Sequence, residues 1–147
     1  MKNKVLIVSL LTLFLGVFVG GVAKAQTEDE LVEMCGMLAK GATYLKEFKV
    51  KLDAGDPPPQ QRHSIVLTKD TRYRFAVCSS KDQPGKVVLQ IYDNTRLLGT
   101  TFMVATGKDT PTFDLTCQKT GVYHLSFYFK DGQSGLAAGT LSFVEKI

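Results

Sequence analysis

The stretch Asp114-Leu-Thr-Cys-Gln-Lys-Thr-Gly-Val-Tyr-His-Leu-Ser-Phe-Tyr-Phe-Lys130 decides the fold of this chain. Apolar and polar side chains alternate in its second half. Because successive side chains of a strand point to opposite faces, this alternation predicts a half-buried β-strand. The buried face would carry Tyr123, Leu125, Phe127 and Phe129, and the opposite face His124, Ser126, Tyr128 and Lys130. Thr120-Gly121 supplies a turn, so we expect residues 113–117 to form the other strand of a central hairpin.

Further strand candidates recur along the chain, separated by residues that favour turns. Tyr73, Phe75 and Val77 share one face of their strand, and Leu141 and Phe143 do the same near the C-terminus. The predicted strands cover 48–52, 64–67, 72–78, 86–92, 96–103, 112–117, 122–130 and 139–145. Regular spacing with alternation predicts an all-β fold, an antiparallel, jelly-roll-like β-sandwich of about eight strands.

The N-terminal residues have the pattern of a secretory signal peptide. Lys2 and Lys4 precede an uncharged apolar run over 5–22, and Ala23-Lys24-Ala25 places small residues where a signal peptidase reads them. We therefore expect a signal peptide over 1–25, cleavage before Gln26, and export to the periplasm or the extracellular space. The alternative is an uncleaved membrane anchor, because the run approaches the length of a spanning helix.

One helix is expected at the start of the exported part. Thr27 and Glu30 have the spacing of a capping box, and Leu31, Cys35 and Leu38 then recur at helical intervals. The pattern predicts an N-terminal α-helix over about 28–41 that packs on the sandwich. We expect residues 26–147 to form a single domain.

The charge balance argues against a nucleic-acid partner. The whole chain carries 18 Lys and Arg and 14 Asp and Glu. Cleavage of the leader would remove Lys2, Lys4 and Lys24. The exported part would then have 15 basic and 14 acidic residues and a net charge of +1. Nucleic-acid binding needs a clustered basic patch, which this composition does not provide. We also expect no membrane insertion after cleavage. Nothing in the sequence indicates an oligomeric state.

Three cysteines remain, Cys35, Cys78 and Cys117. Their spacing excludes a Cys-x-x-Cys redox or zinc motif, and a structural role is favoured. Export makes a disulfide plausible, and the odd count leaves one thiol over. Cys78 falls on the strand face opposite Phe75, whereas Cys117 shares its face with Phe113, and Cys35 could meet either. We expect one disulfide that involves Cys35, with the pairing left open.

From His63 to Val144 the chain resembles the bacterial pre-peptidase C-terminal type of β-sandwich. The matching segments are Lys69-Asp-Thr-Arg-Tyr-Arg-Phe75, Val88-Leu-Gln-Ile-Tyr-Asp93, Thr120-Gly-Val-Tyr123 and Gly139-Thr-Leu141. The resemblance implies an exported, jelly-roll-like module of the kind often attached to proteases or other secreted enzymes. This chain departs from that pattern, because it carries no catalytic domain and adds an N-terminal helix and three cysteines.

Motifs for catalysis and for metal binding are missing from the sequence. His63 and His124 are the two histidines, and neither they nor the cysteines have the spacing of a zinc site. No Gly-x-Ser-x-Gly elbow is present, and Asp53 with Asp56, the closest acidic pair on a loop, has the pattern of a solvated turn. We expect no cofactor and no metal.

One group of outward-facing side chains suggests binding. Tyr128, His124, Tyr92 and Arg74 are the candidate ligand-binding residues, because aromatic and cationic side chains on one sheet face could contact a glycan or a protein. Tyr128 and His124 share a strand, and the other two could join them only if their strands belong to the same sheet. The alternatives are that the N-terminal helix covers this face or that the four residues lie on different sheets.

Export, near-neutral charge and missing catalytic motifs together predict a non-catalytic binding or accessory module of the bacterial cell envelope, with a glycan or an envelope protein as its partner. A protein-assembly subunit of an envelope complex is the second hypothesis. A small secreted hydrolase with His124 as its base is the third, and a pocket beside His124 that contains a nucleophile would favour it.

Overall fold

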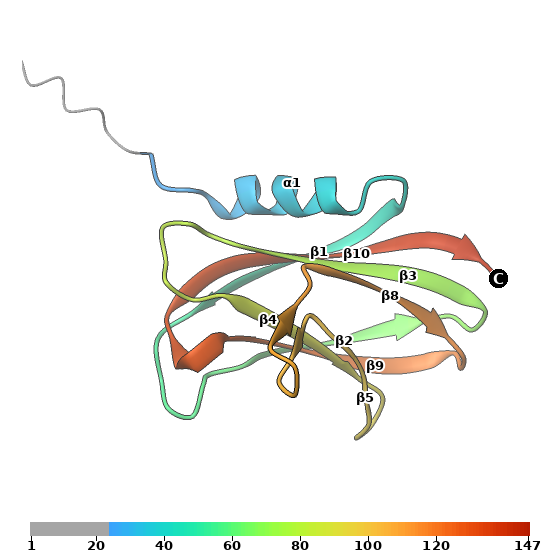
Figure 1. The fold of residues 1–147 in the computed structure, drawn as a ribbon. Helices are drawn as coiled ribbons and strands as arrows, with labels where there is room; N and C mark the ends of the chain where they lie inside the picture. Colours follow the sequence, from blue (N-terminus) through green and yellow to red (C-terminus); the bar gives the residue numbers. More distant parts are fainter. Residues whose placement is uncertain (1–23) are drawn as a thin grey trace, which may run out of the picture.

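The computed structural model describes residues 24–147, which form an antiparallel β-sandwich with one α-helix (Figure 1). The predicted fold class is confirmed. The predicted signal peptide lies outside the described residues except for Lys24 and Ala25. In chain order the elements are α1 (Glu28–Leu38), β1 (Thr43–Leu52), β2 (Gln61–Leu67), β3 (Thr71–Ser79), β4 (Val87–Tyr92), β5 (Leu97–Thr100), β6 (Phe102–Met103), β7 (Lys108–Asp109), β8 (Thr112–Cys117), β9 (Gly121–Phe129), the short 3₁₀ turn η1 (Lys130–Gly132) and β10 (Gly135–Lys146).

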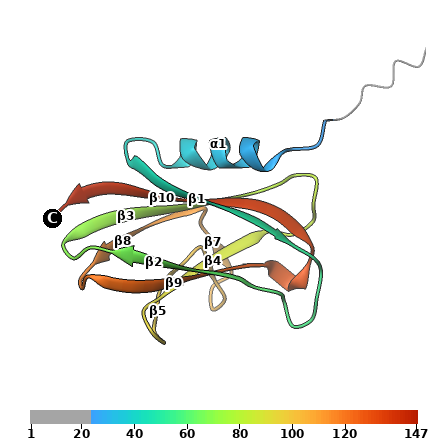
Figure 2. The same ribbon diagram turned by 180° about the vertical axis from the view of Figure 1, so that it is seen from behind.

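The strands form two four-stranded sheets that lie face to face (Figures 1 and 2). Sheet A has the order β1-β10-β3-β8, and sheet B has the order β2-β9-β4-β5. Neighbouring strands within each sheet are antiparallel. The two-residue strands β6 and β7 pair with each other in a small hairpin between β5 and β8.

The predicted central hairpin is wrong, although β9 does lie in the middle of its sheet. β8 pairs with β3 at the edge of sheet A, whereas β9 lies between β2 and β4 in sheet B, so the chain crosses from one sheet to the other between them. Cys117 and Tyr123 on either side of this corner both face the core. The Tyr123 hydroxyl donates to the carbonyl oxygen of Lys119, and the Cys117 thiol donates to the same oxygen. These bonds hold the connection as a corner, which resembles the tyrosine corner of other sandwiches.

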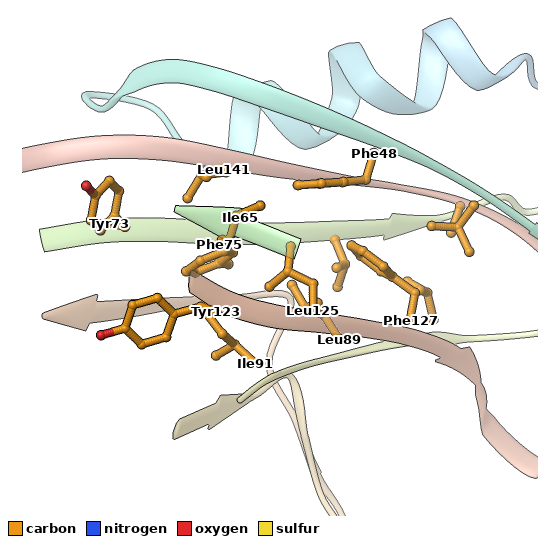
Figure 3. Close-up of a cluster of buried hydrophobic side chains, with 14 of the residues drawn as sticks. Phe48, Ile65, Tyr73, Phe75, Leu89, Ile91, Tyr123, Leu125, Phe127 and Leu141 are labelled. Atoms are coloured by element: carbon orange, nitrogen blue, oxygen red, sulfur yellow. The ribbon is translucent and has the colours of Figure 1, made fainter. Parts of the chain in front are cut away.

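The core between the sheets is made by the inner faces that the alternation predicts (Figure 3). The inward side chains of β9 are buried, and they pack with those of β4 from the same sheet and those of β3 from the opposite sheet. Phe127 contacts Phe48 at a ring-centroid distance of 5.5 Å, and Phe75 stacks on Phe113 at 5.2 Å. Burial of large aromatic rings supplies most of the hydrophobic stabilisation of such a core.

Two glycines of β10 make room for rings from the opposite sheet. A Cβ atom added at Gly139 would lie 2.7 Å from Cε1 of Phe127, and one added at Gly135 would lie 2.3 Å from Cε1 of Phe129. Both separations are shorter than carbon atoms tolerate, so any larger residue would push the rings away. The glycines therefore set how closely sheet A approaches sheet B.

The helix packs on the outer face of sheet A. Thr27 caps it as predicted, since its Oγ1 accepts a hydrogen bond of 3.2 Å from the amide of Glu30. Leu31 and Cys35 are buried against Ala138 of β10, whereas Leu38, expected on the same stripe, is 41% exposed. The helix ends at Leu38, earlier than the predicted boundary near residue 41.

The helix also brings two of the cysteines together. The Cys35 thiol donates to the carbonyl oxygen of Ala138 at 3.3 Å, and Ala138 is the cross-strand partner of Cys78 on β3. All three thiols are free in the structure. The hydrogen bond between the thiols of Cys35 and Cys78, followed by burial, raises the pKa of Cys35, and the same bond lowers the pKa of Cys78. Cys117 lies apart from them, inside the sandwich.

A pair of glycine-to-alanine changes tests the packing of the two sheets. Gly139→Ala should destabilise the domain by about 1–3 kcal/mol, because the added methyl group overpacks the core at Phe127. Gly36→Ala is the matched control, since Gly36 lies in α1 and a Cβ there meets nothing within 4 Å. It should stabilise by about 0.5–1 kcal/mol through helix propensity alone. Urea unfolding measures both; equal effects would contradict the packing described for Gly139.

In an oxidising environment, Cys35 and Cys78 are expected to form a disulfide. Thiol–disulfide exchange with an oxidised disulfide donor would start at Cys78, whose pKa is lowered and which is half-buried, and would stabilise the domain by about 2–4 kcal/mol. Mass spectrometry after alkylation without reduction should find Cys117 as the only alkylated cysteine in denatured protein. Labelling of Cys35 in correctly folded, exported protein would contradict the prediction.

Candidate functional site

The outer face of sheet B points away from the helix. The only α-helix of residues 24–147 packs on the opposite sheet, so the alternative in which it covers the candidate binding face is wrong (Figure 1). The register of sheet B places its outward side chains in rows that run across the strands, and two neighbouring rows lie at the centre of the candidate site. One row is Ser64, His124, Tyr92 and Leu97, and the next is Arg62, Ser126, Gln90 and Thr100.

A pocket of about 660 Å³ opens over these rows. Its volume lies in the range typical of ligand sites in proteins. Its lining residues are Gln60, Arg62, His63, Ser64, Gln90, Tyr92, Asn94, Thr95, His124, Leu125 and Ser126. None of them is an aspartate or a glutamate, so the lining combines amides, hydroxyls and imidazoles with one cation.

Hydrogen bonds between neighbouring strands fix the polar side chains of the pocket. Ser64 Oγ and His124 Nδ1 lie 3.1 Å apart, within hydrogen-bond distance. The Tyr92 hydroxyl donates to the side-chain oxygen of Gln90 at 2.8 Å. The side-chain oxygen of Gln60 accepts from Ser126 Oγ at 3.0 Å. Because these groups hold one another, the surface presented to a ligand is largely preorganised.

The structure brings two of the four predicted ligand-binding residues together. Tyr92 and His124 are cross-strand partners and both line the pocket. Arg74 lies on β3 in sheet A, where its guanidinium binds Asp114 at 2.7 and 3.0 Å, so it does not belong to this face. That pairing lowers the pKa of Asp114 and raises the pKa of Arg74.

Tyr128 points outward from β9 as expected, but it does not line the pocket and is only partly exposed. Its cross-strand partner Val88 is fully buried although it lies on the same outer face. Directly after β9, Lys130 of η1 contacts the ring of Phe102 and the carboxylate of Asp109, which places the β6–β7 hairpin beside this end of the sheet. Burial raises the pKa of Tyr128, with a smaller contribution from Tyr92.

The sequence reasoning missed Arg62 and Ser64 as pocket residues. The sequence pattern could have identified them. Arg62 and Ser64 alternate with the inward residues His63 and Ile65, just as the outward residue His124 alternates with its inward neighbours. The predicted strand began at residue 64, three residues after the observed start at Gln61, and thus left Arg62 in the loop that follows the prolines.

His63 lies partly between the sheets. Its ring centroid is 5.0 Å from that of Phe48 and 5.9 Å from that of Phe127. Burial, and secondarily the charge of Lys46, lowers its pKa below the ordinary value. Within residues 24–147 no group of three or more His, Cys, Asp or Glu side chains is placed to hold a metal ion. No helix of the same residues combines the length and apolar character needed to cross a membrane.

No protein-family model and no curated protein matches the chain. Among solved structures, it is similar to PliG from Aeromonas hydrophila, a periplasmic lysozyme inhibitor of g-type lysozyme, at 11% identity and a TM-score of 0.52, over 71% of this chain and 90% of that one. It also has a loose structural resemblance to the pre-peptidase C-terminal domain of a collagenase from Bacillus anthracis, at 14% identity and a TM-score of 0.49, over 67% of this chain and 89% of that one. At these identities the similarities concern the fold.

The lowered pKa of His63 predicts a loss of stability in acid. At a pH between the folded pKa of His63 and its unfolded value of about 6.5, the unfolded chain binds more protons than the folded chain. The contribution of His63 to the free energy of unfolding is therefore fully present above about pH 6.5 and is lost as the pH falls below that value. His63→Phe keeps an aromatic ring beside Phe48 and removes the titration. Urea unfolding between about pH 7.5 and 5.5 should show a smaller loss for the variant than for the wild type. Equal losses would contradict the prediction.

Proposed function

We propose that this chain is an exported, non-catalytic binding module of the bacterial cell envelope that recognises its partner through the outer face of sheet B. The observation that carries the proposal is the polar pocket around His124 and Tyr92 on the face that the helix leaves open. The partner is a protein or a glycan of the envelope.

The arrangement of the two faces supports this function. Sheet A has its outer face covered by Leu31 and Cys35 of the helix, whereas sheet B keeps a preorganised polar surface directed to solvent. Aromatic side chains with a polar tip, such as Tyr92, are common anchors at binding surfaces. The Aeromonas hydrophila protein with a similar fold is an inhibitor of a lysozyme, so a protein with this kind of sandwich acts there on another protein.

Capture from envelope extracts tests the proposal. Three forms of residues 26–147 would be immobilised: the wild type, the double variant Tyr92→Ala with His124→Ala, and the control Arg74→Gln. The control removes a charge from the outer face of sheet A. The double variant should retain about tenfold less of any saturably bound partner, because anchors of this kind contribute at least about 1–2 kcal/mol to binding.

The control Arg74→Gln should retain as much partner as the wild type, and thermal unfolding must show that all three proteins are folded. Equal capture by the double variant and the wild type would contradict binding at this pocket. Loss of capture in Arg74→Gln alone would move the binding surface to sheet A.

A hydrolase is the second candidate, because the pocket beside His124 does contain a nucleophile. Ser64 Oγ lies 3.1 Å from His124 Nδ1, which is the separation that a nucleophile and its base require. Within the described part of the chain, no carboxylate lines the pocket to orient the imidazole as the third member of a triad would. A fluorophosphonate probe distinguishes the two functions: the binding module should leave Ser64 unlabelled, and labelling that disappears in His124→Gln would favour the hydrolase.

A further inference from the structure

Arg62 differs from the other arginines of the chain in its partners. Arg72, Arg74 and Arg96 each pair with a carboxylate, those of Glu145, Asp114 and Asp93, at 2.7, 2.7 and 3.7 Å. Arg62 instead donates from Nε and one terminal nitrogen to the single side-chain oxygen of Gln60, at 3.3 and 3.2 Å. Among residues 24–147, no carboxylate contacts Arg62.

The geometry of Arg62 leaves its charge available to bind an anion. A guanidinium group presents a planar set of N–H donors that matches the two oxygens of a carboxylate. One neutral amide oxygen satisfies these donors less well than a carboxylate and does not neutralise the positive charge. Gln60 is itself held by Ser126, so it restrains the arginine without neutralising it. Gln90 and Asn94, which line the same pocket, supply further amide donors, and no acidic side chain of residues 24–147 lines the pocket to compete with a bound anion.

The surroundings of the pocket favour a protein as the source of that anion. Val66 and Val122 are cross-strand partners in the row next to Ser64 and His124, and they are 69% and 54% exposed. Leu97, at the end of the pocket row, is 45% exposed. Exposed aliphatic side chains around a polar centre suit a partner with apolar side chains of its own, and they would contribute little to a hydrophilic saccharide.

We propose that the pocket on sheet B receives an Asp or Glu side chain from a loop of a partner protein, with Arg62 binding its carboxylate and with Val66 and Val122 contacting apolar residues of the same loop. This inference rests on the proposed function and adds the chemistry of the partner. Arg62 is then the residue that determines specificity, and Tyr92 and His124 line the same pocket.

A library of constrained loop peptides displayed on phage, panned against residues 26–147, tests the inference. The peptides enriched on the wild type should contain Asp or Glu beside an apolar residue. Each enriched peptide should bind Arg62→Gln at least about tenfold more weakly than it binds the wild type. A peptide in which Asn or Gln replaces the acidic residue should lose as much affinity for the wild type. Both losses are expected because a hydrogen-bonded charge pair contributes more than about 1.4 kcal/mol. Arg72→Gln is the control and should bind as the wild type does, because Arg72 is a partly exposed arginine of sheet A that pairs with Glu145.

The outcomes separate this inference from the proposed function. Enriched peptides that need Tyr92 and His124 but neither an acidic residue nor Arg62 would overturn the carboxylate site and leave the binding face intact. Binding of uronic-acid oligosaccharides that depends on Arg62, without acidic peptides, would replace the protein partner with a glycan. Enrichment that is unaffected by any variant of sheet B would overturn both.

Discussion

The close approach of Phe127 and Phe129 to Gly139 and Gly135 is the contact on which the rest of the structure depends. It fixes β9 of sheet B against β10 of sheet A, and each ring occupies the space that a side chain on β10 would need. Because side chains alternate along a strand, fixing these two rings inward also fixes His124 outward. A slip of one residue in register would invert both faces and remove the pocket.

The helix gives the sandwich two different faces. Its buried residues Leu31 and Cys35 close the outer surface of sheet A over Ala138, and a bond between Cys35 and Cys78 would make that closure covalent. No helix of residues 24–147 covers the pocket rows of sheet B in this way. The polar side chains there are bonded across strands, so they are ordered before any partner arrives, which lowers the entropy cost of binding.

The alternation in the sequence was enough to predict the fold class, most of the strands and most of the buried faces, because burial of one side of a strand leaves a period of two in the side chains. The single strand predicted over 96–103 is wrong, since it divides into β5 and β6 in different sheets, and β7 was not predicted. The alternation could not predict which strands pair. Residues 113–117 and Tyr123 to Phe129 were therefore joined in one hairpin, although the corner at Lys119 sends them to different sheets. The same limit affected the site: Arg74 and Tyr92 both point outward, but from opposite sheets.

Two further differences at the site have local causes. Tyr128 is outward yet partly covered, because the β6–β7 hairpin packs beside that end of β9, and no short-range pattern shows this. Arg62 was missed because the strand that carries it begins directly after a proline-rich loop, where turn-forming residues hide the alternation. Within the candidate site, Tyr92 and His124 could be identified from the sequence. Arg62, which contacts Gln60 and lines the pocket, was identified only in the structure.

Photo-crosslinking in cells that export the protein is the most direct test of binding through sheet B. A photoreactive phenylalanine analogue would replace Val122 beside the pocket or, in a matched protein, Met37 on the helix; these apolar residues are 54% and 67% exposed. Crosslinking of a partner from position 122 and not from position 37 is the expected result. Crosslinking from position 37 alone would place the binding surface on the helix and contradict the function proposed for sheet B.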